Sequence, residues 1–267
     1  MVDFTQARQN MVDCQLRTNK IVNDALVNAF LTVPRERFVE KGREAIAYAD
    51  KDISVGLDRY LIAPMALAQL IQSLKAQPDE VALDVGCATG YSSAILAHLV
   101  MTVVALENEN GLASRANDNF TNLAVDNAVV VEGKLNEGCA IHGPYDIICV
   151  GGAISVIPSR LIEQLSEGGR LGAIIDSGYG LGKAVLVTKC NERITEQPRR
   201  TKTINLGDLG KEFQTFLKND EAQKWIKDHE IHTKIIRDKL SKEKIKNWNE
   251  KDLLEIYDEL WANNNFK

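Results

Sequence analysis

Five short, nearly continuous apolar runs divide the middle of the chain, and stretches with helical spacing separate them. The runs are rich in β-branched residues, which is typical of strands buried on both faces of a parallel sheet. Strand and helix in alternation predict a doubly wound, mostly parallel α/β sheet, with a further strand at 184–190. The five predicted strands are 81–86, 102–107, 128–133, 145–152 and 169–176.

Helical spacing precedes the first strand and fills the gaps between the strands. Residues 7–39 predict two helices, and residues 65–76 predict a third that leads into the first strand. In 158–168 a proline stands near the start and a glycine at the end, the usual asymmetry of a helix. The helices predicted between the strands are 91–100, 111–124 and 158–168.

The composition changes near residues 198–210. Residues 199–267 contain 15 Lys/Arg and 13 Asp/Glu, so 28 of these 69 residues are charged. Apolar residues recur there at helical spacing. The sequence therefore predicts a first domain at 1–198 and a helical appendage of unknown role at 199–267.

Composition limits the classes of partner that we expect. The net charge of -5 gives no reason to expect nucleic acid, and no apolar run approaches the roughly 20 residues of a membrane span. The five cysteines are scattered and the four histidines lack ligand spacing, so we expect neither disulfides nor a metal site. Free thiols and an N-terminus without an apolar signal segment predict a cytoplasmic protein.

A glycine-containing turn follows the first predicted strand, in LDVGCATGYSS at 83–93. Gly86 and Gly90 are four residues apart, so the turn lacks the three-glycine spacing that seats a pyrophosphate. Glu107 ends the next strand, 107 - 84 = 23 residues after Asp84, where a carboxylate accepts hydrogen bonds from ribose hydroxyls. An adenosine-type cofactor without a diphosphate satisfies both observations, and S-adenosylmethionine is such a molecule.

Three segments resemble known methyltransferases. Residues 84–97, DVGCATGYSSAILA, resemble the first motif of class I methyltransferases, with Ala88 in place of the middle glycine. Residues 10–39, with VPRE-x-FV at 33–39, resemble the N-terminal helices of the protein-L-isoaspartate O-methyltransferase family. Residues 145–171 resemble a later segment of the same family. The resemblance implies a Rossmann-like class I methyltransferase fold preceded by N-terminal helices.

The resemblance also implies a cofactor site. Asp84, Gly86 and Gly90 would shape the pocket for the amino-acid end of S-adenosylmethionine, and Glu107 would bind its ribose. Lys134 stands where the family usually has an aspartate, so backbone groups are expected to serve there. The other residues that the resemblance places at the cofactor are Cys87, Ala88, Asn108, Lys134 and Leu135.

By the same resemblance, the expected activity is methylation of L-isoaspartyl residues in damaged proteins or peptides, which is protein repair. The substrate loop departs from the family in VGLDRYLIAP at 55–64, where Tyr60 and Ile62 replace a threonine and a serine. We predict that Arg59 and Tyr60 take over the lost contacts, since arginine binds carboxylates bidentately. Alternatively, both are ordinary loop residues. The rival functions are a methyltransferase with another acceptor and a catalytically silent module that binds S-adenosylmethionine; the oligomeric state is not predicted.

Overall fold

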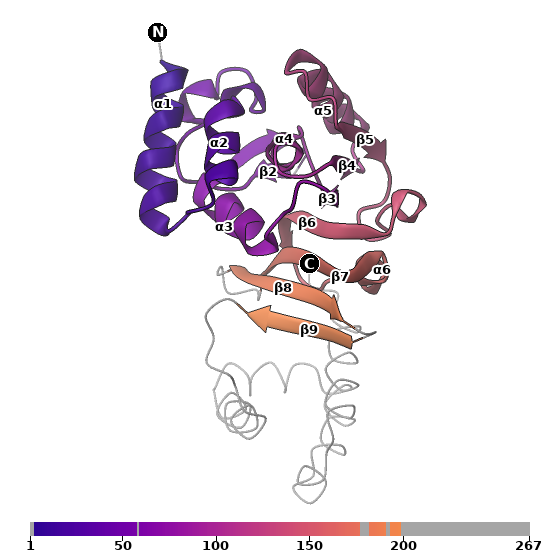
Figure 1. The fold of residues 1–267 in the computed structure, drawn as a ribbon. Coiled ribbons are helices and arrows are strands. Elements are labelled where there is room, and N and C mark those ends of the chain that lie inside the picture. Colours follow the sequence, from indigo (N-terminus) through magenta and orange to yellow (C-terminus); the bar gives the residue numbers. More distant parts are fainter. Residues whose placement is uncertain (1–2, 58, 177–181, 191–192, 199–267) are drawn as a thin grey trace, which may run out of the picture. The chain divides into compact units, whose positions relative to one another are not determined.

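The chain is described by a computed structural model that covers residues 3–57, 59–176, 182–190 and 193–198 (Figure 1). For 193–198 it describes the backbone alone. The helical appendage predicted at 199–267 lies outside the described residues.

The described residues form a seven-stranded sheet in the order β5-β4-β3-β6-β7-β8-β9. The strands β5, β4, β3, β6 and β7 run parallel to one another, whereas β8 and β9 are antiparallel to their neighbours. The predicted mostly parallel sheet is therefore confirmed, and β9 is a strand that the sequence did not predict. The bounds are β3 (Val81–Val85), β4 (Thr102–Glu107), β5 (Ala128–Glu132), β6 (Tyr145–Ile154), β7 (Leu165–Asp176), β8 (Gly182–Cys190) and β9 (Arg193–Pro198).

The order of the strands reverses between β3 and β6. From β3 the chain adds β4 and then β5 on one side, and it returns to the other side of β3 to form β6. In open α/β sheets, ligands bind beyond the carboxyl ends of the strands at such a reversal. The turn after Val85 and the end of β6 lie at this point.

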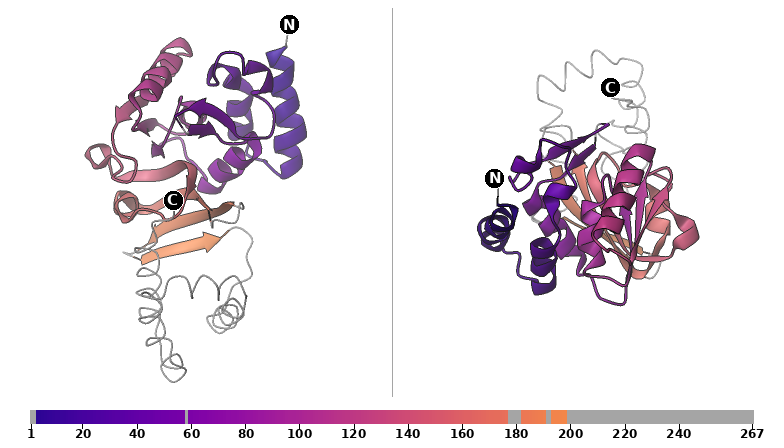
Figure 2. Two further views of the ribbon diagram at one scale, coloured as in Figure 1. Left: turned by 180° about the vertical axis from the view of Figure 1, so that it is seen from behind. Right: turned by 90° about the horizontal axis from the view of Figure 1, so that it is seen from above.

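Helices cover both faces of the sheet, most of them one face (Figures 1 and 2). Alternate strand residues such as Ala105 and Ile147 pack with the helices α1 to α5, while Leu106 and Ile148 pack on the other face with α6. The helices are α1 (Phe4–Met11), α2 (Asp24–Thr32), α3 (Pro64–Leu74), α4 (Tyr91–Ala97), α5 (Asn110–Asn122) and α6 (Ser159–Glu163). The first of them continues into a π-helical turn at Val12–Leu16 and a 3₁₀ turn at Arg17–Asn19.

The helix predicted at 158–168 is much shorter in the structure. It ends at Glu163, because Leu165 already pairs with Tyr145 in the β6–β7 ladder and is buried. Gly168 follows with a φ of 78°, a conformation that glycine adopts readily. Burial of Leu165 in the sheet thus decides the end of this helix, which its sequence pattern alone extends too far.

A small hairpin, β1 (Ile53–Gly56) and β2 (Arg59–Leu61), precedes α3. The fully buried Arg35 anchors it: Nη2 donates to the carbonyl oxygen of Ile62 at 2.8 Å, and the guanidinium lies 4.7 Å from the centre of the Tyr91 ring. Burial lowers the pKa of Arg35 from its usual value. Because Tyr91 begins α4, this contact fixes the hairpin beside the turn that follows β3.

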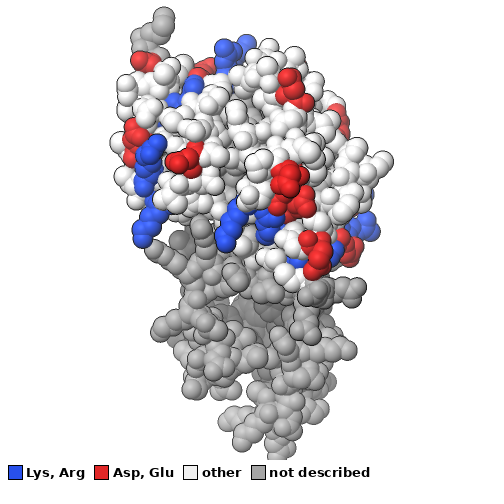
Figure 3. All heavy atoms as spheres, viewed as in Figure 1, with Lys and Arg blue, Asp and Glu red and all other residues white. Residues whose placement is uncertain are grey.

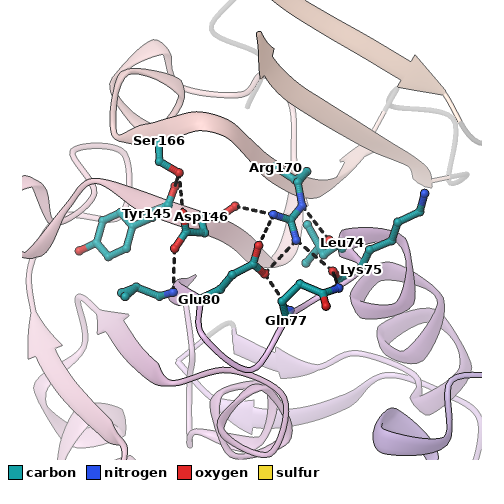
Figure 4. Close-up of polar contacts among 9 residues, drawn as sticks. Leu74, Lys75, Gln77, Glu80, Tyr145, Asp146, Ser166 and Arg170 are labelled. Carbon is teal, nitrogen blue, oxygen red and sulfur yellow. Dashed lines mark hydrogen bonds and ion pairs between the residues drawn. The ribbon is translucent and has the colours of Figure 1, made fainter.

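A second arginine joins the strands at their amino ends, away from the turn that follows β3 (Figure 4). Arg170 on β7 forms two hydrogen bonds to the Glu80 carboxylate, at 2.6 and 2.9 Å, and Nε donates to the carbonyl oxygen of Leu74 at 2.9 Å. Nearby, the carboxylate of Asp146 accepts from the backbone N–H of Val81 at 3.0 Å. This network lies at the amino ends of β3 and β6, so it supports the sheet at a distance from the carboxyl edge.

Candidate cofactor site at the carboxyl edge

The turn between β3 and α4 requires left-handed backbone at three positions. Gly86, Ala88 and Gly90 have φ values of 75°, 51° and 92°. A Cβ on Gly90 would lie 2.7 Å from Cε1 of Phe120, so that position also lacks space for a side chain. Ala88 adopts the same backbone region at a cost of about 1 kcal/mol, which explains how alanine stands in for the family's glycine.

Asp84 lies beneath this turn and is fully buried. Its Oδ2 accepts hydrogen bonds from the hydroxyls of Ser92 at 2.6 Å and Ser93 at 2.5 Å, so it fastens α4 to the end of β3. Burial raises the pKa of Asp84 to about 6, and the two hydroxyls oppose that rise. In the described structure Asp84 shapes the turn from below and has no exposed atoms in the cavity.

Cys87 is also buried, and burial raises the pKa of its thiol well above the usual range. A thiol of this kind stays protonated and is a poor nucleophile. Cys87 therefore fills the loop.

Glu107 ends β4 as predicted, and its carboxylate is fully buried. Oε2 accepts from the backbone N–H of Ala88 at 2.8 Å, and Oε1 accepts from those of Asn108 at 2.9 Å and Glu109 at 3.2 Å. Arg59 of the hairpin supplies a fourth donor, with Nε at 3.4 Å from Oε1. Its Nη2 also donates to Oδ1 of Asn108. The structure thus brings Arg59, Glu107 and Asn108 together.

A cavity of about 700 Å³ opens beside these residues. Arg59, Tyr60 and Ile62 line it from the hairpin, and Gly86 and Leu135 line it from the loops after β3 and β5. Cys87 and Ala88 line a smaller adjoining space together with Tyr60 and Gly86. The volume of the larger cavity, about 700 Å³, falls within the range of typical small-molecule sites.

Lys134 points away from this cavity. Its side chain is 75% exposed and pairs with Glu137 at 3.2 Å. The next two residues, Leu135 and Asn136, line the cavity instead. Asn136 was not among the predicted site residues.

The sequence also missed the end of β6, where Gly151 to Ile154 line the cavity. A Cβ on Gly151 would lie 2.9 Å from the carbonyl oxygen of Gly86, so glycine is needed where the two backbones approach. The signal was present in the sequence: a glycine pair at the carboxyl end of a predicted parallel strand lies at the same edge as the motif turn.

One known family matches most of the chain. The family described as Protein-L-isoaspartate(D-aspartate) O-methyltransferase matches residues 6–208. The chain belongs to this family. A relative from Methanoculleus marisnigri, named Protein-L-isoaspartate O-methyltransferase, is 31% identical over 204 residues, which cover 76% of this chain and 88% of the relative. One of the same name from Koribacter versatilis is 34% identical over 171 residues, 64% of this chain and 77% of the relative.

Two solved structures share the fold of this isoaspartate methyltransferase family member. One, titled protein-L-isoaspartate O-methyltransferase, has a TM-score of 0.63 at 24% identity and covers 79% of this chain and 71% of its own. The other, from Plasmodium falciparum and titled as a putative family member in complex with S-adenosyl-L-homocysteine, has a TM-score of 0.63 at 22% identity. It covers 76% of this chain and 96% of its own. The predicted class I methyltransferase fold is confirmed.

Within residues that the structure describes, no three His, Cys, Asp or Glu side chains gather as metal ligands, and no helix reaches the length and apolarity of a membrane span. Figure 3 shows acidic and basic side chains interspersed over the described part of one face.

Proposed function

We propose that this chain is an S-adenosylmethionine-dependent carboxyl methyltransferase that acts on L-isoaspartyl residues of damaged proteins. The observation that carries the proposal is the family match over 6–208, which spans both the motif turn and the hairpin that line one cavity. Methylation of the isoaspartyl carboxylate activates it, and attack by the neighbouring backbone nitrogen then releases methanol and forms a succinimide. Hydrolysis of the succinimide regenerates aspartate, which is repair. We place this activity in the cytoplasm, on the cysteine pattern of the sequence.

The residues of the site fit the proposed cofactor. Gly86 and Gly90 give the turn two positions without a side chain, and Glu107 has its carboxylate at the end of β4, where it would bind ribose hydroxyls. Asn108 and Leu135, two further residues of the predicted set, lie at the same edge, whereas Lys134 of that set does not line the cavity. When bound, S-adenosylmethionine supplies a methyl group on a positively charged sulfonium sulfur.

The acceptor carboxylate is ionised at neutral pH, so the chain needs no general base. Its task is to position and desolvate that carboxylate. Apolar side chains such as Ile62, Val150 and Leu161 line the cavity and exclude water, while Arg59 and Tyr60 present polar groups to it. These two residues take the place of the family's hydroxyls in the proposed site.

Transfer of a labelled methyl group from S-adenosylmethionine tests the proposal. The acceptors are a synthetic isoaspartyl peptide and its aspartyl twin of the same sequence. We expect base-labile label on the isoaspartyl peptide alone. Equal label on both peptides, or none while S-adenosylhomocysteine still binds in calorimetry, would reject isoaspartyl repair in favour of another acceptor or a silent binding module.

A further inference from the structure

Arg59 stands between the proposed cofactor site and the cavity. Its side chain is 28% exposed, it lines the cavity, and its guanidinium reaches Glu107 and Asn108. The two partners are 48 and 49 residues away along the chain, at the end of β4. A single side chain thus contacts both the ribose-binding carboxylate and the space proposed for the acceptor.

The carboxylate of Glu107 is fully enclosed in this structure. Oε1 accepts from Arg59, Asn108 and Glu109, and Oε2 accepts from Ala88 alone, so a lone-pair position on Oε2 is open but is not exposed. Three of the four donors are backbone N–H groups of Ala88, Asn108 and Glu109, which the fold holds in place. Ribose hydroxyls can reach the enclosed carboxylate only if one of the groups around it moves, and among the four donors Arg59 is the one on a flexible side chain.

The cavity offers the displaced guanidinium a new partner. Among the described residues that line it, Arg59 is the one cationic side chain, whereas Asp52 and Asp176 are acidic. A carboxylate that enters this space meets no other described positive charge from the chain. Arginine binds carboxylates in a bidentate manner, so an acceptor carboxylate replaces Glu107 as its partner.

We infer that Arg59 exchanges partners during the reaction: cofactor binding releases it from Glu107, and it then binds the carboxylate of the acceptor. This inference rests on the proposed function and adds an order of binding to it, with the cofactor before the acceptor. The pairing of Arg59 with Glu107 opposes cofactor binding, and the freed guanidinium favours acceptor binding. One side chain thereby couples the two sites.

Calorimetry with S-adenosylhomocysteine tests the first half of the exchange. Arg59→Ala removes the competing donor, so we expect its Kd to fall by about two- to fivefold relative to the unaltered chain, within the range for an exposed ion pair. Arg43→Ala is the matched control, because Arg43 contacts the same hairpin at Ser54 and pairs with Glu40 away from Glu107. It should leave the Kd unchanged. An unchanged or higher Kd in Arg59→Ala would mean that Arg59 supports Glu107, and the exchange would be wrong.

Peptide binding and turnover test the second half. In the unaltered chain, saturating S-adenosylhomocysteine should tighten isoaspartyl peptide binding by a similar factor of about two to five, because both effects draw on the same Arg59–Glu107 pair, and Arg59→Ala should abolish this coupling. The KM for the peptide should rise at least tenfold in Arg59→Ala with a smaller change in kcat, and Arg59→Lys should recover part of it because the charge remains. A KM equal to that of the unaltered chain, or coupling that survives in Arg59→Ala, would overturn the acceptor role.

The two proposals fail in different ways. If the unaltered chain methylates no isoaspartyl peptide, the proposed function is rejected, while the effect of Arg59→Ala on S-adenosylhomocysteine affinity still judges the release from Glu107. If the peptide is methylated and Arg59→Ala behaves like Arg43→Ala in both assays, the exchange is rejected and the proposed function stands.

Discussion

The buried carboxyl group of Asp84 should make the free energy of unfolding depend on pH. The group is fully buried, Oδ2 accepts from Ser92 and Ser93, and Oδ1 is a buried atom without a hydrogen-bond partner in the described structure. Burial is the largest cause of its pKa of about 6, and the charge of Glu107 adds to the rise. The fold therefore holds a proton on Asp84 more tightly than the unfolded chain does.

The magnitude follows from the two pKa values. The folded value of about 6 stands against an ordinary value of 3.8, and this gap corresponds to about 3 kcal/mol. Because the folded pKa is the higher one, Asp84 lowers the free energy of unfolding as pH rises from about 4 to 6. Below pH 3.8 the penalty is absent, and above pH 6 it is fully present.

Asp84→Asn removes the charge and keeps the shape. The amide oxygen can accept from both serines, and the amide nitrogen takes the place of Oδ1, which has no partner to lose. In urea unfolding at several pH values, the free energy of unfolding of Asp84→Asn should rise relative to that of the unaltered chain between about pH 4 and 6. At pH 8 the gain should reach up to about 3 kcal/mol.

Ser93→Ala provides a second test of the raised pKa of Asp84. The hydroxyl of Ser93 lowers the pKa of Asp84, so its removal should move the pH window of lost stability upward. A difference between Asp84→Asn and the unaltered chain that does not change with pH would refute the reasoning. The reasoning would also be refuted if Asp84→Asn were less stable than the unaltered chain at pH 8.

Two further predictions separate the cofactor site from the scaffold. Gly151→Ala should weaken S-adenosylhomocysteine binding at least tenfold in calorimetry, because its Cβ would press on the carbonyl oxygen of Gly86, whereas Gly111→Ala, with open space around it, should not change the affinity. Arg170→Met should lower the free energy of urea unfolding by about 3 kcal/mol, since it leaves the part-buried Glu80 carboxylate without its bidentate partner, and it should leave S-adenosylhomocysteine affinity within twofold. Equal losses of stability and affinity in Arg170→Met would contradict this separation.

The sequence predicted the parallel strands well because their burial on both faces leaves an unbroken apolar run. It failed at β9, whose residues RITEQP are mostly polar, lack a period of two and end in proline. Among the described residues this strand pairs with β8 alone, so its sequence is not constrained in the same way. The end of α6 was missed for a related reason: the pattern of 158–168 suits a helix, and only pairing with β6 draws Leu165 into the sheet.

The site was predictable where its residues are close in sequence. The motif turn and Glu107 follow from strand ends that meet at one edge of the sheet. The contact between Arg59 and Glu107 spans 48 residues, and the approach of Gly151 to Gly86 depends on the pairing of β3 with β6. Distances of this kind are set by tertiary packing, and a pattern read along the chain does not contain them.

The departures from the family lie on a hairpin that also has anchors independent of them. Arg35 holds it through the carbonyl oxygen of Ile62, Asp52 through the backbone N–H of Ala63, and Arg115 through the carbonyl oxygen of Val55. These three contacts reach main-chain atoms, so they persist whichever side chains stand at 59, 60 and 62, and Arg59 adds its own contacts to Glu107 and Asn108. Changes at these positions therefore act on the chemistry that the cavity presents to an acceptor, and the loss of the family's hydroxyls is compatible with an intact cofactor site.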